Sequence, residues 1–107
     1  MKVSELGEFG LIDRLAVMVE HAQGEPGNNL VVGIGDDAAV WQSNAQAQLA
    51  TVDSLVQDVH FSLGTASWEE VGWKSLAVNL SDIAAMGGQP EYAWYRSVCP
   101  VIPTLKM

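Results

Sequence analysis

The sequence predicts an α+β fold, in which two helices cover one face of a β-sheet. Residues 7–21 and 67–86 each place apolar side chains at the spacing of an amphipathic helix. Short runs of β-branched and aromatic residues, which are typical of strands, lie near Val31, Leu49, Val59 and Tyr92. Two helices suffice for only one face of such a sheet, so the other face should be apolar and in need of a partner.

Composition limits the classes of protein to which the chain can belong. With 107 residues, 49% hydrophobic and 17% charged, it is long enough to be one domain, spanning 1–107, with a core of its own. Five Lys and Arg against thirteen Asp and Glu give a net charge of −8, which argues against nucleic acid or an anionic membrane as a partner. The sequence shows no signal peptide and no apolar run long enough to cross a bilayer, so a cytoplasmic protein is expected.

The first helix is predicted between residue 7 and about residue 21. Its apolar residues at helical spacing are Phe9, Ile12, Ala16 and Val19. A loop should follow at 23–29, where Gly and Pro interrupt the pattern, and it should lead into a strand at 30–32.

The most distinctive stretch is 31–40, an apolar run that ends in two glycines and then brings two adjacent carboxylates, Asp36 and Asp37. Gly33 and Gly35 allow a tight turn or a close approach to a ligand. Adjacent side chains diverge on an extended backbone, so one carboxylate can face a ligand while the other caps the turn or meets solvent. These residues alone leave two interpretations open, a ligand site or a solvated turn in a hairpin.

Further strands are predicted at 40–41, 48–52, 59–61 and 92–98. The run at 48–52 leads directly into Asp53, so a second acid follows a second predicted strand. Carboxylates are thereby expected at the ends of two different elements.

The second helix should open at a capping box formed by Ser67 and Glu70, run to about Met86 and stop at Gly87-Gly88. Its apolar stripe is predicted to be core and comprises Trp73, Leu76, Ala77, Leu80, Ile83, Ala84 and Gly87. Another face aligns a hydroxyl, an amide and a carboxylate, those of Ser75, Asn79 and Asp82. Because such short polar residues are poor helix formers and have apolar neighbours, we expect them to be partly buried and oriented rather than solvated.

Few kinds of catalytic or binding site can be formed from the residue types in this sequence. The sequence lacks a Walker-type phosphate loop, the third glycine of a dinucleotide fingerprint and a Cys/His cluster for zinc. Cys99 could pair with His60 as a nucleophile, but a lone cysteine after an apolar strand is more often a small buried hydrophobe. The remaining candidates are carboxylates on separate elements, namely Asp36, Asp37, Asp53 and Asp82. Hard oxygen ligands suit Mg²⁺ and phosphoryl groups, and in a chain poor in cations a polyphosphate would be held mainly through metal ions.

Several motifs occur together in the order of a known family. They are Gly7-Glu8-Phe9-Gly10-Leu11-Ile12, Gly33-Ile34-Gly35-Asp36-Asp37, Thr51-Val52-Asp53 with Val59-His60-Phe61, Val71-Gly72-Trp73-Lys74, and Asn79-Leu80-Ser81-Asp82-Ile83-Ala84-Ala85-Met86-Gly87-Gly88. Between Lys2 and about Trp94 the chain resembles the N-terminal half of thiamine-monophosphate kinase, a family of the aminoimidazole-ribotide synthetase-like superfamily. The resemblance implies an ATP- and Mg²⁺-binding and dimerisation domain built from a mixed β-sheet and helices.

The resemblance also implies an activity and a set of site residues. The enzyme would transfer the γ-phosphate of ATP to thiamine monophosphate, giving thiamine diphosphate, and would work as a homodimer whose N-terminal sheets pack together. Mg²⁺ would be bound by Asp37, Thr51, the backbone carbonyl of Val52, Asp53 and Asp82, ATP by Asp36, Asp37 and Asn79, and thiamine monophosphate by His60. No residue is assigned as catalytic, because this transfer needs charge neutralisation and alignment more than a covalent group.

The chain departs from the family pattern at Val52, where a hydroxyl residue is usual, and at Asp58, where a small residue is common. No Lys or Arg stands in an obvious position to replace the metal. The family continues for about another domain, which supplies further Asp ligands and much of the ATP pocket, so the chain alone is expected to self-associate but not to catalyse. Two alternatives remain, another member of the same superfamily and a non-catalytic dimerisation module.

Overall fold

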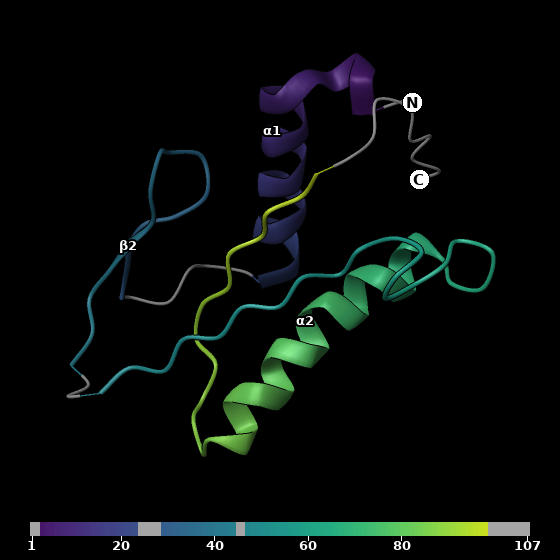
Figure 1. The fold of residues 1–107 in the computed structure, drawn as a ribbon. Coiled ribbons are helices and arrows are strands. Elements are labelled where there is room, and N and C mark those ends of the chain that lie inside the picture. The colour runs from purple at the N-terminus through teal and green to yellow at the C-terminus, as the bar shows by residue number, and fades with distance from the viewer. Residues whose placement is uncertain (1–2, 24–28, 45–46, 99–107) are drawn as a thin grey trace. The chain divides into compact units, whose positions relative to one another are not determined.

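The computed structural model describes residues 3–23, 29–44 and 47–98. In chain order the elements are α1 (Val3–Gln23), β1 (Leu30–Val32), β2 (Val40–Trp41) and α2 (Trp68–Ala85) (Figure 1). The two helices and the small sheet agree with the predicted α+β class. Residues 24–28 of the predicted loop and Cys99 lie outside the described residues.

The chain divides into two compact units, each of which is described by itself. One unit consists of Met1–Ala45 and Arg96–Met107, and it holds α1 and the hairpin. The other consists of Gln46–Tyr95 and holds α2 with the chain before and after it. Neither helix in the described part of the chain is long and apolar enough to cross a membrane.

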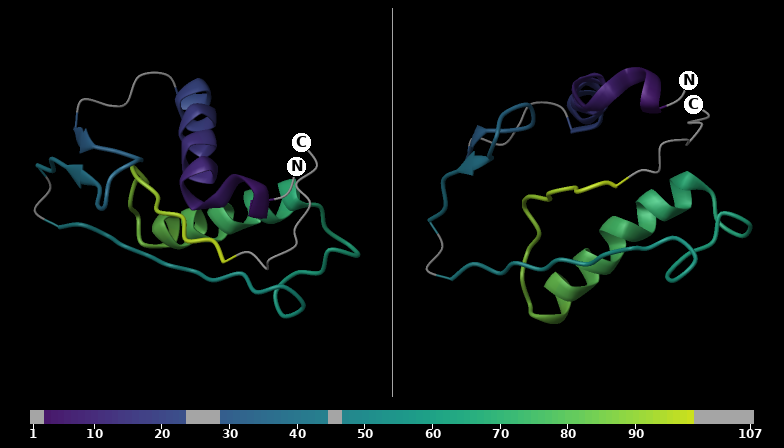
Figure 2. Two further views of the ribbon diagram at one scale, coloured as in Figure 1. Left: turned by 90° about the horizontal axis from the view of Figure 1, so that it is seen from above. Right: turned by 45° about the horizontal axis from the view of Figure 1, so that its top comes forward.

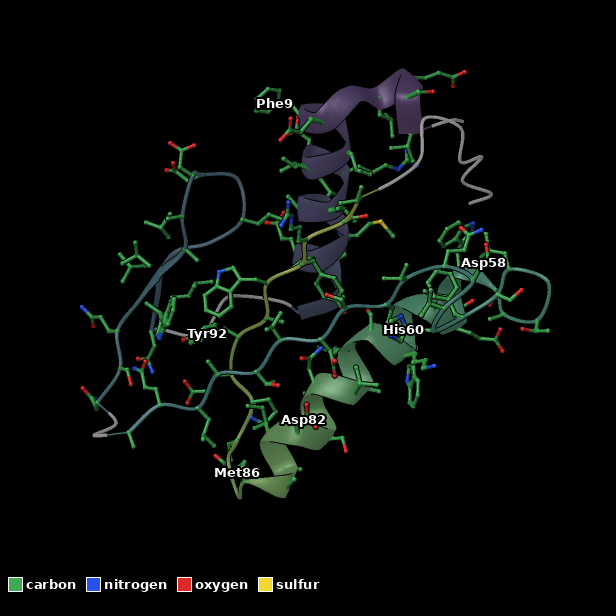
Figure 3. All side chains as sticks on the ribbon, in the orientation of Figure 1. Phe9, Asp58, His60, Asp82, Met86 and Tyr92 are labelled. Atoms are coloured by element: carbon green, nitrogen blue, oxygen red, sulfur yellow. The ribbon has the colours of Figure 1, made fainter. Side chains whose placement is uncertain are left out.

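Helix α1 forms over the predicted segment but begins earlier, at Val3. Gly7 interrupts it with φ 68° and ψ 179°, a backbone conformation that is essentially limited to glycine. The first turn therefore meets the rest of the helix at a kink. Phe9, on the predicted apolar face, is 79% exposed, so this face is not buried (Figure 3).

The strands predicted at 30–32 and 40–41 are present as β1 and β2, and they form a hairpin around the acidic bend, an arrangement that the sequence left open beside a ligand site. They pair antiparallel, with Leu30 opposite Trp41 and Val32 opposite Val40, and the register is irregular between the two pairs. Gly35 has φ 111°, which only glycine adopts readily, so the tight turn that the glycines predict is present. Among the described residues this two-stranded sheet takes the place of the predicted mixed sheet.

Helix α2 begins and ends where the local signals place it. The Ser67 hydroxyl accepts a hydrogen bond from the Glu70 backbone N–H at 3.2 Å, and the Ser67 backbone N–H donates to the Glu70 carboxylate at 2.8 Å. This is the predicted capping box, and it satisfies donors that a helix start would otherwise leave unpaired. At the other end, Gly87 adopts φ 72° and its N–H donates to the Ala84 carbonyl, so the helix stops at the predicted glycine.

Three predicted strands are absent from the structure. Residues 48–52 and 92–98 have no regular secondary structure, and 59–61 belong to a turn with a single bridge between Gln57 and Phe61. A strand is stabilised only by a neighbouring strand that completes its backbone hydrogen bonds, and no described segment supplies one here. These three predictions were wrong for the chain by itself.

The chain before α2 nevertheless runs alongside this helix (Figure 2). The Leu49 side chain lies against Gly88, since a Cβ built on Gly88 would stand 2.5 Å from the Leu49 Cδ1 atom. Thr51 contacts the same helix through a side-chain hydrogen bond. The segment is thus held in place by side chains rather than by a backbone ladder.

The predicted core is not buried. No described residue falls in the buried class, and along the apolar stripe of α2 Trp73 is 75% exposed and Leu80 39% exposed. Ala77 and Ile83 are half-buried. The reason follows from the missing strands, because the stripe was expected to pack against a sheet that the described chain does not form.

Candidate functional site

The acidic bend lies in the first unit, between β1 and β2. The Asp36 carboxylate accepts a hydrogen bond from the backbone N–H of the next residue, Asp37, at 2.8 Å. Both side chains are exposed, and among the described residues the Asp37 carboxylate has no hydrogen-bond partner. One acid is therefore hydrogen-bonded within the bend while the other is open to solvent.

Two predicted metal ligands are brought together in the second unit. The Thr51 hydroxyl donates a hydrogen bond to the Asp82 carboxylate at 3.3 Å, joining the chain before α2 to the C-terminal half of the helix (Figure 3). The two residues are thirty-one positions apart in the sequence. Their contact places a hydroxyl and a carboxylate oxygen, both of a type that Mg²⁺ accepts as ligands, next to each other.

Asn79, one turn before Asp82, has an amide oxygen that lacks a partner. Its amide nitrogen donates to the Ser75 carbonyl at 2.9 Å, which orients the side chain. The Oδ1 atom is buried and has no hydrogen-bond partner in the described structure. Ser75 and Asn79 are partly buried, as predicted, whereas Asp82 is exposed. Because a buried acceptor without a donor is costly, Asn79 presents an oxygen that a ligand N–H, hydroxyl or metal could satisfy.

The other predicted ligands are exposed. Val52 is 88% exposed, and Asp53 next to it is exposed as well. Within the described residues no three His, Cys, Asp or Glu side chains come together as a metal site. Asp37 belongs to one unit while Asp53 and Asp82 belong to the other. The grouping of the three carboxylates therefore stays a prediction.

His60 is held in a tight turn formed by residues 56–61. Its backbone N–H donates to the Val56 carbonyl at 2.8 Å, and its imidazole Nδ1 accepts from the Val56 backbone N–H at 3.0 Å. Asp58 lies in the same turn with φ 63°, the left-handed conformation that short residues such as glycine tolerate best. Asp58 is therefore a position where glycine or asparagine would fit the backbone at least as well.

His60 also lines a hollow of about 340 Å³ beside the N-terminal half of α2. The hollow is lined by His60, Phe61, Ser62, Thr65, Ala66, Glu70, Val71 and Lys74. Lys74 extends from the helix and donates from Nζ to the His60 carbonyl at 3.1 Å. Lys74 was not predicted as a site residue, because nothing in the sequence relates it to a turn fourteen residues earlier.

The wall of the hollow is stabilised by the start of the helix. The Phe61 and Trp68 rings meet edge to face, with centroids 6.3 Å apart. Hydrogen bonds from the Ser67 backbone N–H and then from its hydroxyl lower the pKa of the Glu70 carboxyl below its ordinary value of 4.5. Glu70 is thus kept as a carboxylate whose negative charge stands beside the same hollow as the Lys74 ammonium.

Comparison with known proteins gives consistent relatives. The chain is 44% identical over 88 residues to thiamine-monophosphate kinase of Bacillus subtilis (strain 168), a match that covers 81% of this chain and 26% of the relative. It is 41% identical over 93 residues to thiamine-monophosphate kinase of Aquifex aeolicus (strain VF5), covering 87% of this chain and 27% of the relative. The corresponding enzyme of Synechococcus elongatus is 40% identical over 89 residues, covering 82% and 24%.

The chain therefore spans about a quarter of the length of the curated relatives that it matches. No solved structure gives a significant match. A family model described as AIR synthase related protein, N-terminal domain, matches residues 35–103, which include Asp36, Asp37, Thr51, His60 and Asp82. Because this match covers more than half of the sequence, the chain belongs to the AIR synthase related protein family and carries its N-terminal domain.

Proposed function

We propose that the chain is part of an enzyme that transfers the γ-phosphate of ATP to thiamine monophosphate, giving thiamine diphosphate. The observation that carries this proposal is the identity of 36 to 44% to several proteins named thiamine-monophosphate kinase, over most of this chain. The family model covers the stretches that hold the acidic bend, the His60 turn and α2, and the identity to the named kinases extends over 78 to 87% of the chain. This identity favours the thiamine enzyme over another member of the superfamily.

Mg²⁺ is the metal that this reaction calls for, and the residues present fit it. The proposed ligands are Asp37, Thr51, the backbone carbonyl of Val52, Asp53 and Asp82. All supply oxygen, the donor that Mg²⁺ prefers, and Thr51 already lies against Asp82. The orphaned Asn79 oxygen lies one helical turn from Asp82 and needs a donor or a cation. When bound, Mg²⁺ supplies the positive charge that two anionic reactants need to approach each other.

The chain's own residues bind and orient the reactants. Asp36 accepts a hydrogen bond from the backbone N–H of Asp37, and the Asp37 side chain is exposed and available to a ligand. Asn79 is oriented by Ser75, and its unpartnered amide oxygen is the proposed contact to the nucleotide. His60 contacts thiamine monophosphate through the ring nitrogen that Val56 does not occupy. Alignment of this kind contributes to phosphoryl transfer without any covalent intermediate.

The proposal is tested in the complete gene product by coupled detection of ADP. Turnover should require thiamine monophosphate, ATP and Mg²⁺ together, and His60→Ala should raise the KM for thiamine monophosphate while leaving that for ATP nearly unchanged. The absence of turnover with thiamine monophosphate would show that the activity is wrong. Equal effects of His60→Ala on both substrates would show that His60 is misassigned.

The chain also carries the features of a self-associating domain. Large apolar side chains are exposed in both units, among them Phe9, Val52, Trp73 and Met86. Surfaces of this kind are typical of faces that pack against another chain or domain. The proposal is that two copies associate, and that the chain by itself does not turn over substrate.

Sedimentation over a range of concentrations tests the association. A dimer that forms as the concentration rises supports it, and a monomer at the highest concentration would contradict it. ADP release by the purified chain at the rate of the complete gene product would contradict the second half of the proposal. A stable dimer in a complete gene product without kinase activity would instead favour the non-catalytic dimerisation module.

A further inference from the structure

The turn that carries His60 fixes the state of its imidazole ring. The Val56 backbone N–H donates to Nδ1 at 3.0 Å, and a nitrogen that accepts a hydrogen bond carries no proton. In the neutral ring the proton must then be on Nε2, which becomes a donor. The turn therefore presents His60 as an N–H donor, a form suited to a phosphate or hydroxyl oxygen of a substrate.

Few bonds hold this turn closed. The backbone N–H groups of Val59 and His60 donate to the Val56 carbonyl at 3.2 and 2.8 Å, and the Asp58 N–H donates to the Phe61 carbonyl at 2.7 Å. All of these groups are exposed except those of Phe61, which is half-buried. Exposed backbone bonds open readily, so the ring needs a further restraint to keep one orientation.

Lys74 supplies that restraint from α2. Its Nζ atom donates to the His60 carbonyl at 3.1 Å, and this charge-assisted bond joins the turn to a helix with a complete capping box. The contact is to the backbone, so it acts on the position of His60 without competing for its ring. Lys74 and His60 also line the same hollow.

We propose that Lys74 is a positioning residue for His60, which holds the 56–61 turn so that the imidazole donates from Nε2 into the hollow. This inference rests on the proposed function only where it names thiamine monophosphate as the molecule that His60 contacts. A competing role, in which Lys74 contacts the phosphate of the substrate directly, predicts a different set of outcomes.

The first test reads the ring itself. Nitrogen NMR of the purified chain at mildly alkaline pH, where imidazoles are neutral, should show His60 with unprotonated Nδ1 and protonated Nε2. Lys74→Met, which keeps the length of the stem, should give a ring that averages between the two tautomers and a Val56 amide that exchanges faster. Lys74→Arg should restore both signals, because guanidinium also donates to a carbonyl. Arg96→Met, which removes the same charge elsewhere, should leave them unchanged.

The second test reads substrate binding in the complete gene product. Lys74→Met should raise the KM for thiamine monophosphate by about threefold or more without a matching change in that for ATP. In a His60→Ala background the same substitution should add little, because the residue that it positions is gone. Full additivity of the two substitutions would show that Lys74 acts on substrate independently and would overturn the proposal.

The two tests fail in distinguishable ways. A His60 ring that keeps its single tautomer in Lys74→Met overturns the positioning role, whatever the enzyme does. A wild-type protein that does not phosphorylate thiamine monophosphate overturns the proposed function, whatever the ring does.

Discussion

Helix α2 and the chain on either side of it, as far as Tyr95, belong to the same unit, yet they differ in how much regular structure they form. The helix runs without a break from Trp68 to Ala85 and has a complete capping box and a glycine stop. Residues 48–52 before it and 92–98 after it read equally clearly as strands, but they are irregular. The helix completes its hydrogen bonds within itself, whereas a strand needs another strand.

This difference shows which side chains of the candidate site are oriented by contacts within the described chain. Groups on α2 or tied to it are already oriented, as Asn79 is by Ser75 and His60 is by Lys74. Asp53 lies on a flanking segment and is exposed. The segments predicted as strands on either side of α2 are irregular, because no described segment pairs with them.

The largest effect is expected where a flanking segment meets the helix. Asp82→Asn removes the charge that Thr51 contacts, and Asp53→Asn removes the charge on the segment itself. Each should weaken Mg²⁺-dependent nucleotide binding by the complete gene product at least about tenfold, the scale of losing one ligand charge. Isothermal titration with and without Mg²⁺ measures it.

Glu69→Gln is the matched control for these variants, because it removes one negative charge from the same helix without touching Asp82. It should bind nucleotide as the unmodified protein does. If Asp53→Asn and Asp82→Asn also leave the titrations unchanged, neither residue is a metal ligand.

A smaller effect is expected from breaking the start of α2. Ser67→Ala removes the hydroxyl that accepts from Glu70 and should destabilise the helix by about 1 kcal/mol, the usual cost of losing an N-terminal cap. Helix content from far-UV circular dichroism during urea unfolding measures this loss. Ser67→Asp should preserve most of the stability, since aspartate also caps well. Equal stability of Ser67→Ala and the unmodified chain would mean that α2 does not depend on its cap.

A low pH should destabilise the N-terminal end of α2. The pKa of Glu70 is lowered in the folded state, chiefly by the Ser67 backbone N–H, so its carboxylate favours the folded helix above pH 4.5. This contribution is lost as the pH falls below 4.5 and passes through the folded-state pKa. Helix content should therefore decline over that interval, and Glu70→Gln should flatten the part of the decline that belongs to the cap. An unchanged acid profile in Glu70→Gln would rule out this linkage.

The smallest effect is expected at the His60 turn. Asp58 has φ 63°, which alanine adopts less easily than aspartate, asparagine or glycine. Asp58→Ala should therefore destabilise the turn by a few tenths of a kcal/mol, and Asp58→Asn should be nearly neutral. Amide exchange at Val56 and Val59 detects the change. Faster exchange in Asp58→Asn than in Asp58→Ala would contradict the conformational explanation.

Features that depend on residues close together in the chain could be predicted from the sequence, and features that depend on residues far apart could not. Ser67 with Glu70, and Gly87 at the other end, are signals within a few residues, and they located α2 correctly. The short strands at 30–32 and 40–41 were also located by local signals, whereas the hairpin that joins them was only one of two interpretations of the bend. Three predicted strands, at 48–52, 59–61 and 92–98, would need to pair with distant segments of the chain. Their sequences show only that the residue types suit a strand.

The site shows the same limit. The resemblance assigned Thr51 and Asp82 to one metal shell, and the structure has them in contact. Lys74 was missed because it contacts a backbone carbonyl, and any type of residue at position 60 would have the same carbonyl. The left-handed φ of Asp58 was also not predicted, since aspartate occurs in many backbone conformations.

Because of the kink, the backbone angles allowed to residue 7 determine the direction of the first turn of α1 relative to the rest of the helix. An added Cβ at Gly7 would meet nothing within 4 Å, so the restriction is stereochemical and not one of space. An L-alanine there would favour one continuous helix through Glu5 and Glu8 and would turn the first residues in a new direction. D-alanine, whose preferred backbone angles mirror those of the L form, would keep the kink. Two synthetic chains that differ only in the chirality of alanine at position 7 would therefore differ in the direction of the first turn. The rest of their sequence would be the same.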